Sequence, residues 1–183
     1  MRIARCSSIL IGMLLTACTR TAPPPAAPAP LFLPKASIRE LMDAQVDPAA
    51  DAIWDSVMIT ITAAGEDDKQ PRTEAEWQAV RRSAITLIEA TNLLMMDHHR
   101  IAPADAPQVP GEASASVLEE RLDANRPAFV GFAQALRNVS LQALEAIDAR
   151  DATRLLAAGG EIDGACEACH LVYWYPPDLT PAS

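Results

Sequence analysis

The chain has 183 residues, of which 50% are hydrophobic and 21% are charged, and its formal net charge is −9. This length fits a single domain with short flanking segments. The acidic balance argues against nucleic acid as a partner and favours a partner that presents a basic patch, although the same charge also serves solubility.

The N-terminal residues resemble a bacterial lipoprotein leader. Arg2 and Arg5 precede an apolar run from Ile9 to Leu15, which is too short to span a bilayer. Leu15-Thr16-Ala17-Cys18 then resembles a lipobox, whose cysteine is lipidated and becomes the first residue of the mature protein. We therefore expect a signal peptide over residues 1–17 and a lipid anchor at Cys18, on the periplasmic side of a bacterial membrane. The alternative is an ordinary cleavable signal in which Cys18 is incidental.

Removal of this leader takes away two basic residues and no acidic one, so the net charge changes from −9 to −11. Residues 18–36 follow as a tether, because the proline-rich stretch from Thr21 to Pro34 cannot form a helix or a central strand. Such a stretch is stiff and extended. We expect the folded domain to occupy residues 37–177, with a short tail over residues 178–183.

The first helix is predicted to begin at a capping box formed by Ser37 and Glu40. Apolar residues follow on one helical stripe as far as Ile61, and the stripe keeps its phase across Pro48. We therefore expect a continuous but kinked helix, with Asp47 as a local cap and Pro48 in the first turn after it.

Three more helices follow in the chain. A second capping box at Thr73 and Glu76 opens a helix that runs toward Asp97, and a proline-rich loop follows it. A third helical region runs from about residue 116 to 150, with Pro127 separating a short leading piece from a longer helix. No clear period-two strand pattern is visible, so the predicted class is all-α, an antiparallel four-helix bundle.

The fourth helix is predicted from Asp151 to a point before Pro176. Its apolar or small positions alternate by four and three, which is the seam spacing of a packed bundle, and they include both cysteines: Leu155, Gly159, Ile162, Cys166, Cys169 and Tyr173. Gly159, Gly160 and Gly164 lower helix propensity. Their concentration indicates room for a close neighbour, or else a locally weak helix.

Cys166-Glu167-Ala168-Cys169-His170 is a C-x-x-C-H sequence near the end of this helix. This pattern attaches haem c: both thiols add to the vinyl groups, and the histidine supplies an axial nitrogen to the iron. Residues three and four apart share one helix face, so the three side chains can act on one macrocycle. The sequence therefore predicts one covalently bound haem near the C-terminal end of the fourth helix.

Two other readings of the motif remain open. A thioredoxin-like dithiol needs a neighbouring βαβ pattern, which is not visible in this sequence. A zinc site of two cysteines and two histidines would have to use His98 and His99, whose spacing matches no common zinc finger.

A sixth iron ligand must come from upstream, because residues 171–183 contain neither methionine nor histidine. Met42 lies one turn into the first helix, at the end of the predicted bundle where His170 should lie, whereas Met58 is about 24 Å farther along. Met95, Met96, His98 and His99 fall at the same end and are weaker candidates, since any of these methionines can simply fill the core. Arg100, Arg121 and Arg126 also fall there and could pair with haem propionates or lie on a solvated face.

Together, the leader, the four helices, the C-x-x-C-H near the C-terminus and the early methionine resemble class II c-type cytochromes, the cytochrome c prime group and its low-spin relatives. The resemblance covers about residues 37–175, and only Cys166, Cys169, His170 and Met42 correspond to positions whose roles it carries over. Low-spin members use such a methionine as the sixth ligand, whereas high-spin members lack it. The chain departs from the prime-type pattern at Leu171–Tyr175, where a basic residue is usual.

The expected function depends on Met42. If Met42 binds iron, the protein carries single electrons to a redox partner with a basic docking patch. If Met42 only packs, the open iron suits the binding of nitric oxide or carbon monoxide. A third hypothesis is a zinc-binding structural lipoprotein. No catalytic constellation is apparent, so we do not expect an enzyme, and pairing into a homodimer stays open.

Overall fold

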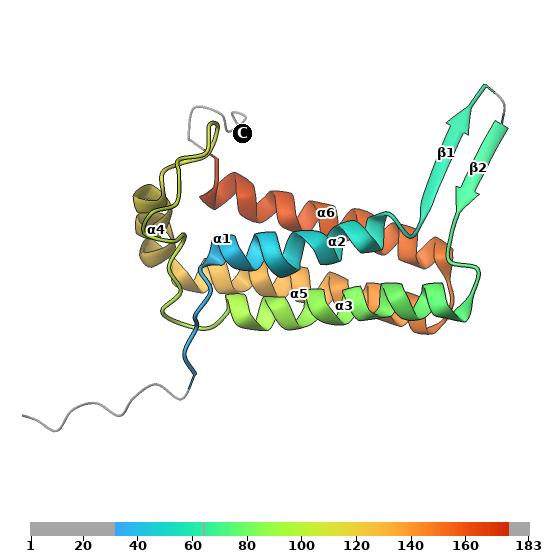
Figure 1. Ribbon diagram of the computed structural model, residues 1–183, viewed down its shortest axis with the longest axis horizontal. Coiled ribbons are helices and arrows are strands. Elements are labelled where there is room, and N and C mark those ends of the chain that lie inside the picture. The colour runs from blue at the N-terminus through green and yellow to red at the C-terminus, as the bar shows by residue number, and fades with distance from the viewer. Residues whose placement is uncertain (1–31, 64, 176–183) are drawn as a thin grey trace, which may run out of the picture. The chain divides into compact units, whose positions relative to one another are not determined.

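The computed structural model describes residues 32–63 and 65–175, which are mostly helical with one small sheet (Figure 1). In chain order the elements are α1 (Ile38–Leu41), the π-helical segment η1 (Met42–Val46), α2 (Asp47–Trp54), β1 (Met58–Thr62), β2 (Gly65–Lys69), α3 (Glu74–Leu94), α4 (Ala115–Ala124), α5 (Arg126–Asp148) and α6 (Ala152–Tyr173). The predicted leader, Cys18, most of the tether and the C-terminal tail lie outside the described residues. Within the described ranges, no helix is both long and apolar enough to cross a membrane.

The first helical stretch is continuous from α1 through η1 to α2. Its predicted capping box is confirmed, because the Ser37 hydroxyl accepts the Glu40 N–H while the Glu40 carboxylate accepts the Ser37 N–H. The π-helical turn brings Leu41 and Val46, five residues apart, onto the same buried side, where an α-helical turn would have aligned Leu41 with Gln45. Asp47 is the first residue of α2 and caps nothing with its side chain, so its predicted role as a local cap was wrong.

The prediction that this helix continues to Ile61 was also wrong. α2 ends at Trp54, and residues 58–69 form an antiparallel hairpin in which Met58 pairs with Lys69 and Thr62 with Gly65. The class is therefore predominantly helical rather than all-α. From Ile59 to Thr62, isoleucine alternates with threonine and all four residues are β-branched, so the segment favours a strand. This preference prevails where Ile61, 80% exposed, has no helix to pack against.

The later helices begin and end where the sequence signals place them. Thr73 caps α3 in a complete capping box, Pro127 lies in the first turn of α5, and Asp151 caps α6 by accepting the Arg154 N–H. One face of α3 is buried along the whole helix, at Trp77, Val80, Ala84, Leu87, Thr91 and Leu94. Caps and prolines thus fix these boundaries, since each satisfies or removes an orphan helix-end group.

The long helices pack side by side around one apolar core (Figure 1). α5 packs extensively on both α3 and α6, while α2 packs on α3 and makes a looser contact with α6. At one end, the Ile38 N–H donates to the Arg100 carbonyl, and the Ala113 N–H donates to the Trp174 carbonyl. The start of α1, the loop after α3 and the end of α6 therefore meet at this end.

Candidate functional site at the end of α6

Cys166, Cys169 and His170 lie on the last two turns of α6. All three are half-buried, and both cysteines pack against the core. Ile162 and Tyr173, which flank them on the same helix, are buried and hold this face against the rest of the domain. Both thiols are free, so the two cysteines do not form a disulfide with each other. The helical spacing therefore presents two sulfurs and one imidazole along one strip.

His170 lies in the last turn of α6. Its carbonyl accepts the N–H groups of both Trp174 and Tyr175, and its ring lies 6.0 Å from the Trp174 ring and 6.2 Å from the Tyr175 ring. Arg121, from α4, donates to the carbonyls of Tyr173 and Tyr175 at 2.8 Å each. These contacts hold residues 173–175 in place and so restrict the motion of the end of α6.

Trp54 and Gly159 fix the register between α2 and α6. The Trp54 indole N–H donates to the Gly159 carbonyl at 2.9 Å. α2 and α6 run in opposite directions (Figure 1). Asp47, seven residues before Trp54, and Cys166, seven residues after Gly159, therefore lie at the same height along the helix axes. The electrostatic influence of Asp47 on the Cys166 thiol agrees with this register.

The surroundings of the two thiols disfavour the thiolate. Burial, reinforced by the carboxylates of Asp47 and Asp163, raises the pKa of Cys166 to about 11. Burial and the neighbouring Cys166 raise the pKa of Cys169 to about 12. A thiol–disulfide oxidoreductase requires the opposite shift, which a helix N-terminus or a nearby cation supplies. A position near a helix C-terminus also disfavours negative charge, so the dithiol reading loses support.

Asp47 faces the same strip of α6. Partial burial raises the pKa of its carboxyl, His170 acts in the opposite direction, and Asp43 and Asp51 add to the increase. The carboxylate is therefore within electrostatic reach of both Cys166 and His170. Sequence reasoning treated Asp47 only as a helix cap, and nothing in its local pattern signalled this position beside the motif.

Met42 is half-buried against the core at the start of η1. The Asp47 N–H donates to the Met42 carbonyl, so Met42 lies one π-helical turn beyond Asp47 toward the start of α1. By the same register between α2 and α6, Met42 lies at the height of His170 along the helix axes. Met58 lies in β1, beyond the other end of α2. Met95 and Met96 follow α3 and are half-buried.

Arg126 carries an unsatisfied polar atom. Its Nη1 is buried and has no hydrogen-bond partner among the described residues, while Nη2 donates to the carbonyls of Leu94 and Met96. The guanidinium lies 5.1 Å from the Phe129 ring centre, and that ring meets the Tyr173 ring edge-on at 5.5 Å. A buried donor without a partner is costly, so this position suits a bound carboxylate.

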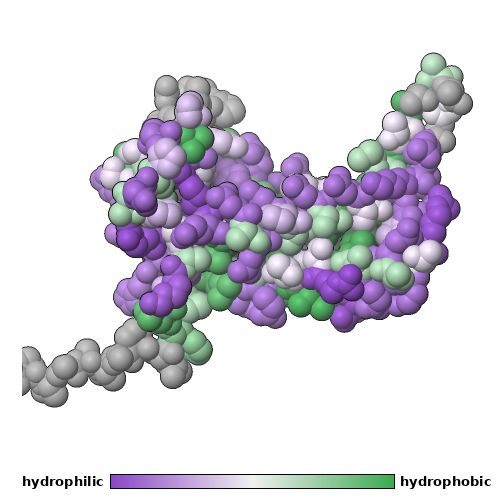
Figure 2. Space-filling view, viewed as in Figure 1, coloured by the Kyte–Doolittle hydropathy of each residue, from purple (hydrophilic) through white to green (hydrophobic). Residues whose placement is uncertain are grey.

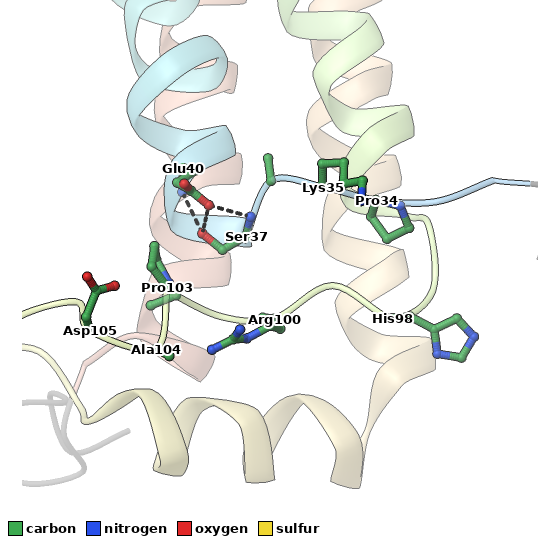
Figure 3. A pocket seen from close by; sticks show the side chains of 11 residues that line it. Pro34, Lys35, Ser37, Glu40, His98, Arg100, Pro103, Ala104 and Asp105 are labelled. Carbon is green, nitrogen blue, oxygen red and sulfur yellow. Dashed lines mark hydrogen bonds between the residues drawn. The ribbon is translucent and has the colours of Figure 1, made fainter.

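Arg100 and His98 lie elsewhere at this end. They line a hollow of about 430 Å³ at the start of α1, together with Lys35 and Asp105 (Figure 3). In Figure 3 the His98 ring turns away from Arg100. Arg121 is occupied by the two carbonyls after Cys169, so Arg126 is the propionate candidate that the geometry favours.

The histidines do not support the zinc alternative. His98 is exposed, and the two ring nitrogens of His99 contact the carbonyls of Ala36 and Leu93 at 2.8 and 2.7 Å. Within residues 32–63 and 65–175, no three side chains of histidine, cysteine, aspartate or glutamate form a group that could hold a metal ion.

The glycines of α6 play different roles. A Cβ atom at Gly159 would lie 3.2 Å from Trp54 Cδ1, so this glycine does accommodate a close neighbour. At Gly160 and Gly164 an added Cβ would meet nothing within 4 Å. Trp54 is therefore the close neighbour at Gly159, whereas the described residues supply none at Gly160 or Gly164.

Comparison of the chain with protein-family models, curated proteins and solved structures found no match.

Proposed function

We propose that the protein is a membrane-anchored periplasmic c-type cytochrome that carries single electrons, folded as a four-helix bundle of the class II type. The observation that carries this proposal is the C-x-x-C-H sequence on one half-buried face of α6, with two free thiols packed on the core. The haem iron, once attached, supplies the one-electron chemistry.

The protein residues fit such a group. Raised pKa values keep the thiols of Cys166 and Cys169 protonated at neutral pH, and the thioethers that replace them carry no charge. The half-buried site therefore accepts the product of attachment without the cost of a buried anion. A dithiol oxidoreductase instead needs a lowered thiol pKa, so this chemistry favours attachment over dithiol exchange.

Four neighbours complete the proposed site. Trp174 and Tyr175 pack near the His170 ring and restrict its orientation. Arg126 offers its unpartnered Nη1 to a propionate carboxylate. Met42, at the level of His170 on the facing helical segment, would hold the iron as its sixth ligand, and a soft thioether there would raise the reduction potential and close the iron to small ligands.

The partner of this electron carrier is proposed to be a protein with a basic patch. Five carboxylates, of which Asp47 is partly buried, flank the seam between the first helical stretch and α6 beside Cys166: Asp43, Asp47, Asp51, Asp163 and Glu167. Long-range attraction of this kind is screened by salt. The rate of electron exchange with a basic partner should therefore fall as ionic strength rises.

The test of the ligand set is the visible spectrum of the purified holoprotein, oxidised and reduced, with and without carbon monoxide. We expect a low-spin spectrum that carbon monoxide does not change, and a high-spin spectrum that responds to the gas in Met42→Ala. Met58→Ala is the matched control, because Met58 lies in the hairpin, and it should leave the spectrum unchanged. A wild-type spectrum that shifts with carbon monoxide would instead support the five-coordinate, gas-binding alternative.

A further inference from the structure

The hairpin of β1 and β2 exposes apolar side chains that the helical part of the protein leaves uncovered. Met58, Ile59 and Ile61 are 45%, 49% and 80% exposed. The two strands contact each other extensively, but neither makes comparable contact with any helix. The hairpin projects from the end of the domain opposite to that where α1 begins (Figure 1), and Figure 2 shows hydrophobic residues along it beside hydrophilic ones.

A two-stranded hairpin of this kind is marginally stable in water unless more strands or a packed helix support it. Ile59 and Ile61 lie two residues apart, so they share one face of the sheet. Among residues 32–63 and 65–175, the surrounding structure leaves most of Ile61 and about half of Ile59 uncovered. Alternate residues of β1 also direct backbone N–H and C=O groups away from β2, which leaves an open edge for another strand.

The charge distribution decides which edge can pair. β1 contains no charged residue, whereas β2 carries exposed Asp67 and Asp68. Self-pairing of β2 would place carboxylates of two copies close together, and like charges across strands are destabilising. The β1 edge has no such obstacle.

The sequence of β1 is also symmetrical about Thr60, since an isoleucine lies on either side of it. In an antiparallel pair of two β1 strands centred on Thr60, Ile59 of each copy lies opposite Ile61 of the other. The four isoleucines then form one apolar patch on one face of the sheet, and pairs of β-branched residues stabilise such sheets. A two-fold axis through Thr60 generates this arrangement, and two-fold dimers are the commonest homo-oligomers.

We propose that β1 binds β1 of a second copy of this chain, which gives a four-stranded sheet with the two β2 strands at its outer edges. An apolar groove of about 430 Å³ between the base of the hairpin and α6, lined in part by Trp54, Val57 and Leu156, continues the surface available to the second copy. The hairpin meets α6 near its N-terminal end, at Ala152 and Leu156, whereas Cys169 and His170 lie near its C-terminal end. The groove extends along α6 as far as Asp163, but Cys166, Cys169 and His170 are not among its lining residues, and the dimer does not depend on the proposed function.

Cysteine cross-linking of the full chain in its membrane tests both the dimer and its register. Thr60→Cys places the new thiol on the two-fold axis, where the Cα atoms of facing residues are about 4.5–5.5 Å apart, within the range of a disulfide. We expect this variant to form a disulfide-linked dimer on mild oxidation. Asp67→Cys is the matched control, because Asp67 lies opposite Thr60 in the hairpin but on the outer strand. Two such residues would be about 14 Å apart, three strand spacings, and should not cross-link.

Sedimentation equilibrium of the purified full-length protein in detergent provides the second measurement. Ile59→Lys keeps the hairpin, since the introduced lysine faces Asp68 across the two strands, but it places a charge in the isoleucine patch. We expect it to weaken dimerisation at least tenfold, while Ile61→Val leaves it within about threefold of wild type. A monomeric wild type, a dimer that Thr60→Cys does not cross-link, or equal cross-linking of Thr60→Cys and Asp67→Cys would each overturn the proposal.

Discussion

Substitution of Gly159 by alanine probes the contact that sets the register between α2 and α6. An added Cβ atom would lie 3.2 Å from Trp54 Cδ1 and 3.7 Å from Trp54 Nε1. The shorter separation is tighter than an ordinary van der Waals contact, so the indole must shift. A shift would also strain the 2.9 Å hydrogen bond from the indole N–H to the Gly159 carbonyl.

Two effects oppose each other in Gly159→Ala. Replacement of a helical glycine by alanine stabilises by about 1 kcal/mol. Overpacking at a buried contact costs about 1–3 kcal/mol, and a weakened hydrogen bond costs up to about 1 kcal/mol more. We therefore expect Gly159→Ala to lower the free energy of unfolding.

Gly160→Ala is the matched control, because an added Cβ at the neighbouring position meets nothing within 4 Å. It should raise the free energy of unfolding by about 1 kcal/mol, so the two variants should differ by about 2 kcal/mol. Urea unfolding of the holoprotein, followed by far-UV circular dichroism, measures the difference. Equal stabilisation by both substitutions would refute the register from which Met42 is placed at the level of His170.

Two further predictions concern the end of α6. Arg121→Gln removes a charged donor to the Tyr173 and Tyr175 carbonyls, so it should lower the free energy of unfolding by about 2 kcal/mol and speed amide exchange in the last turn of α6. Arg82→Gln, at an exposed position, is the control. Equal amide exchange in the two variants would contradict the role assigned to Arg121. In the chain prepared without haem, Asp47→Asn removes a carboxylate that raises the Cys166 pKa, so more thiolate should exist at pH 9 and alkylation of Cys166 should accelerate. The same variant should leave the alkylation rate of Cys169 nearly unchanged, because burial and Cys166 raise the pKa of Cys169. An unaltered alkylation rate at Cys166 would place Asp47 away from that thiol.

Much of the helical framework could be predicted from local signals. The capping boxes at Ser37 and Thr73, the N-cap at Asp151 and the prolines at 48 and 127 each act within one helical turn, so the sequence alone is enough to place them. The hairpin was missed because Val57 and Ile61 continue the helical phase of the preceding residues. Only the absence of a helix surface opposite Ile61 makes the strand preference decisive.

For the candidate site too, local sequence predicts some features, whereas others depend on packing between distant segments. The C-x-x-C-H spacing identifies its three central residues within one segment, and their half-buried positions on α6 depend on the same periodicity. The position of Asp47 beside Cys166 depends on how α2 and α6 pack, and the unpartnered Nη1 of Arg126 depends on which carbonyls its other nitrogen reaches. Such properties arise from contacts between distant segments, which no local pattern encodes.

The central claim is that one haem is bonded to the chain through Cys166 and Cys169. Intact-mass spectrometry under denaturing conditions, on protein matured in a host that attaches haem c, tests it directly. We predict a mass equal to the processed polypeptide plus one haem, and loss of that addition in the double variant Cys166→Ser, Cys169→Ser. A wild-type mass equal to the polypeptide alone would contradict the account.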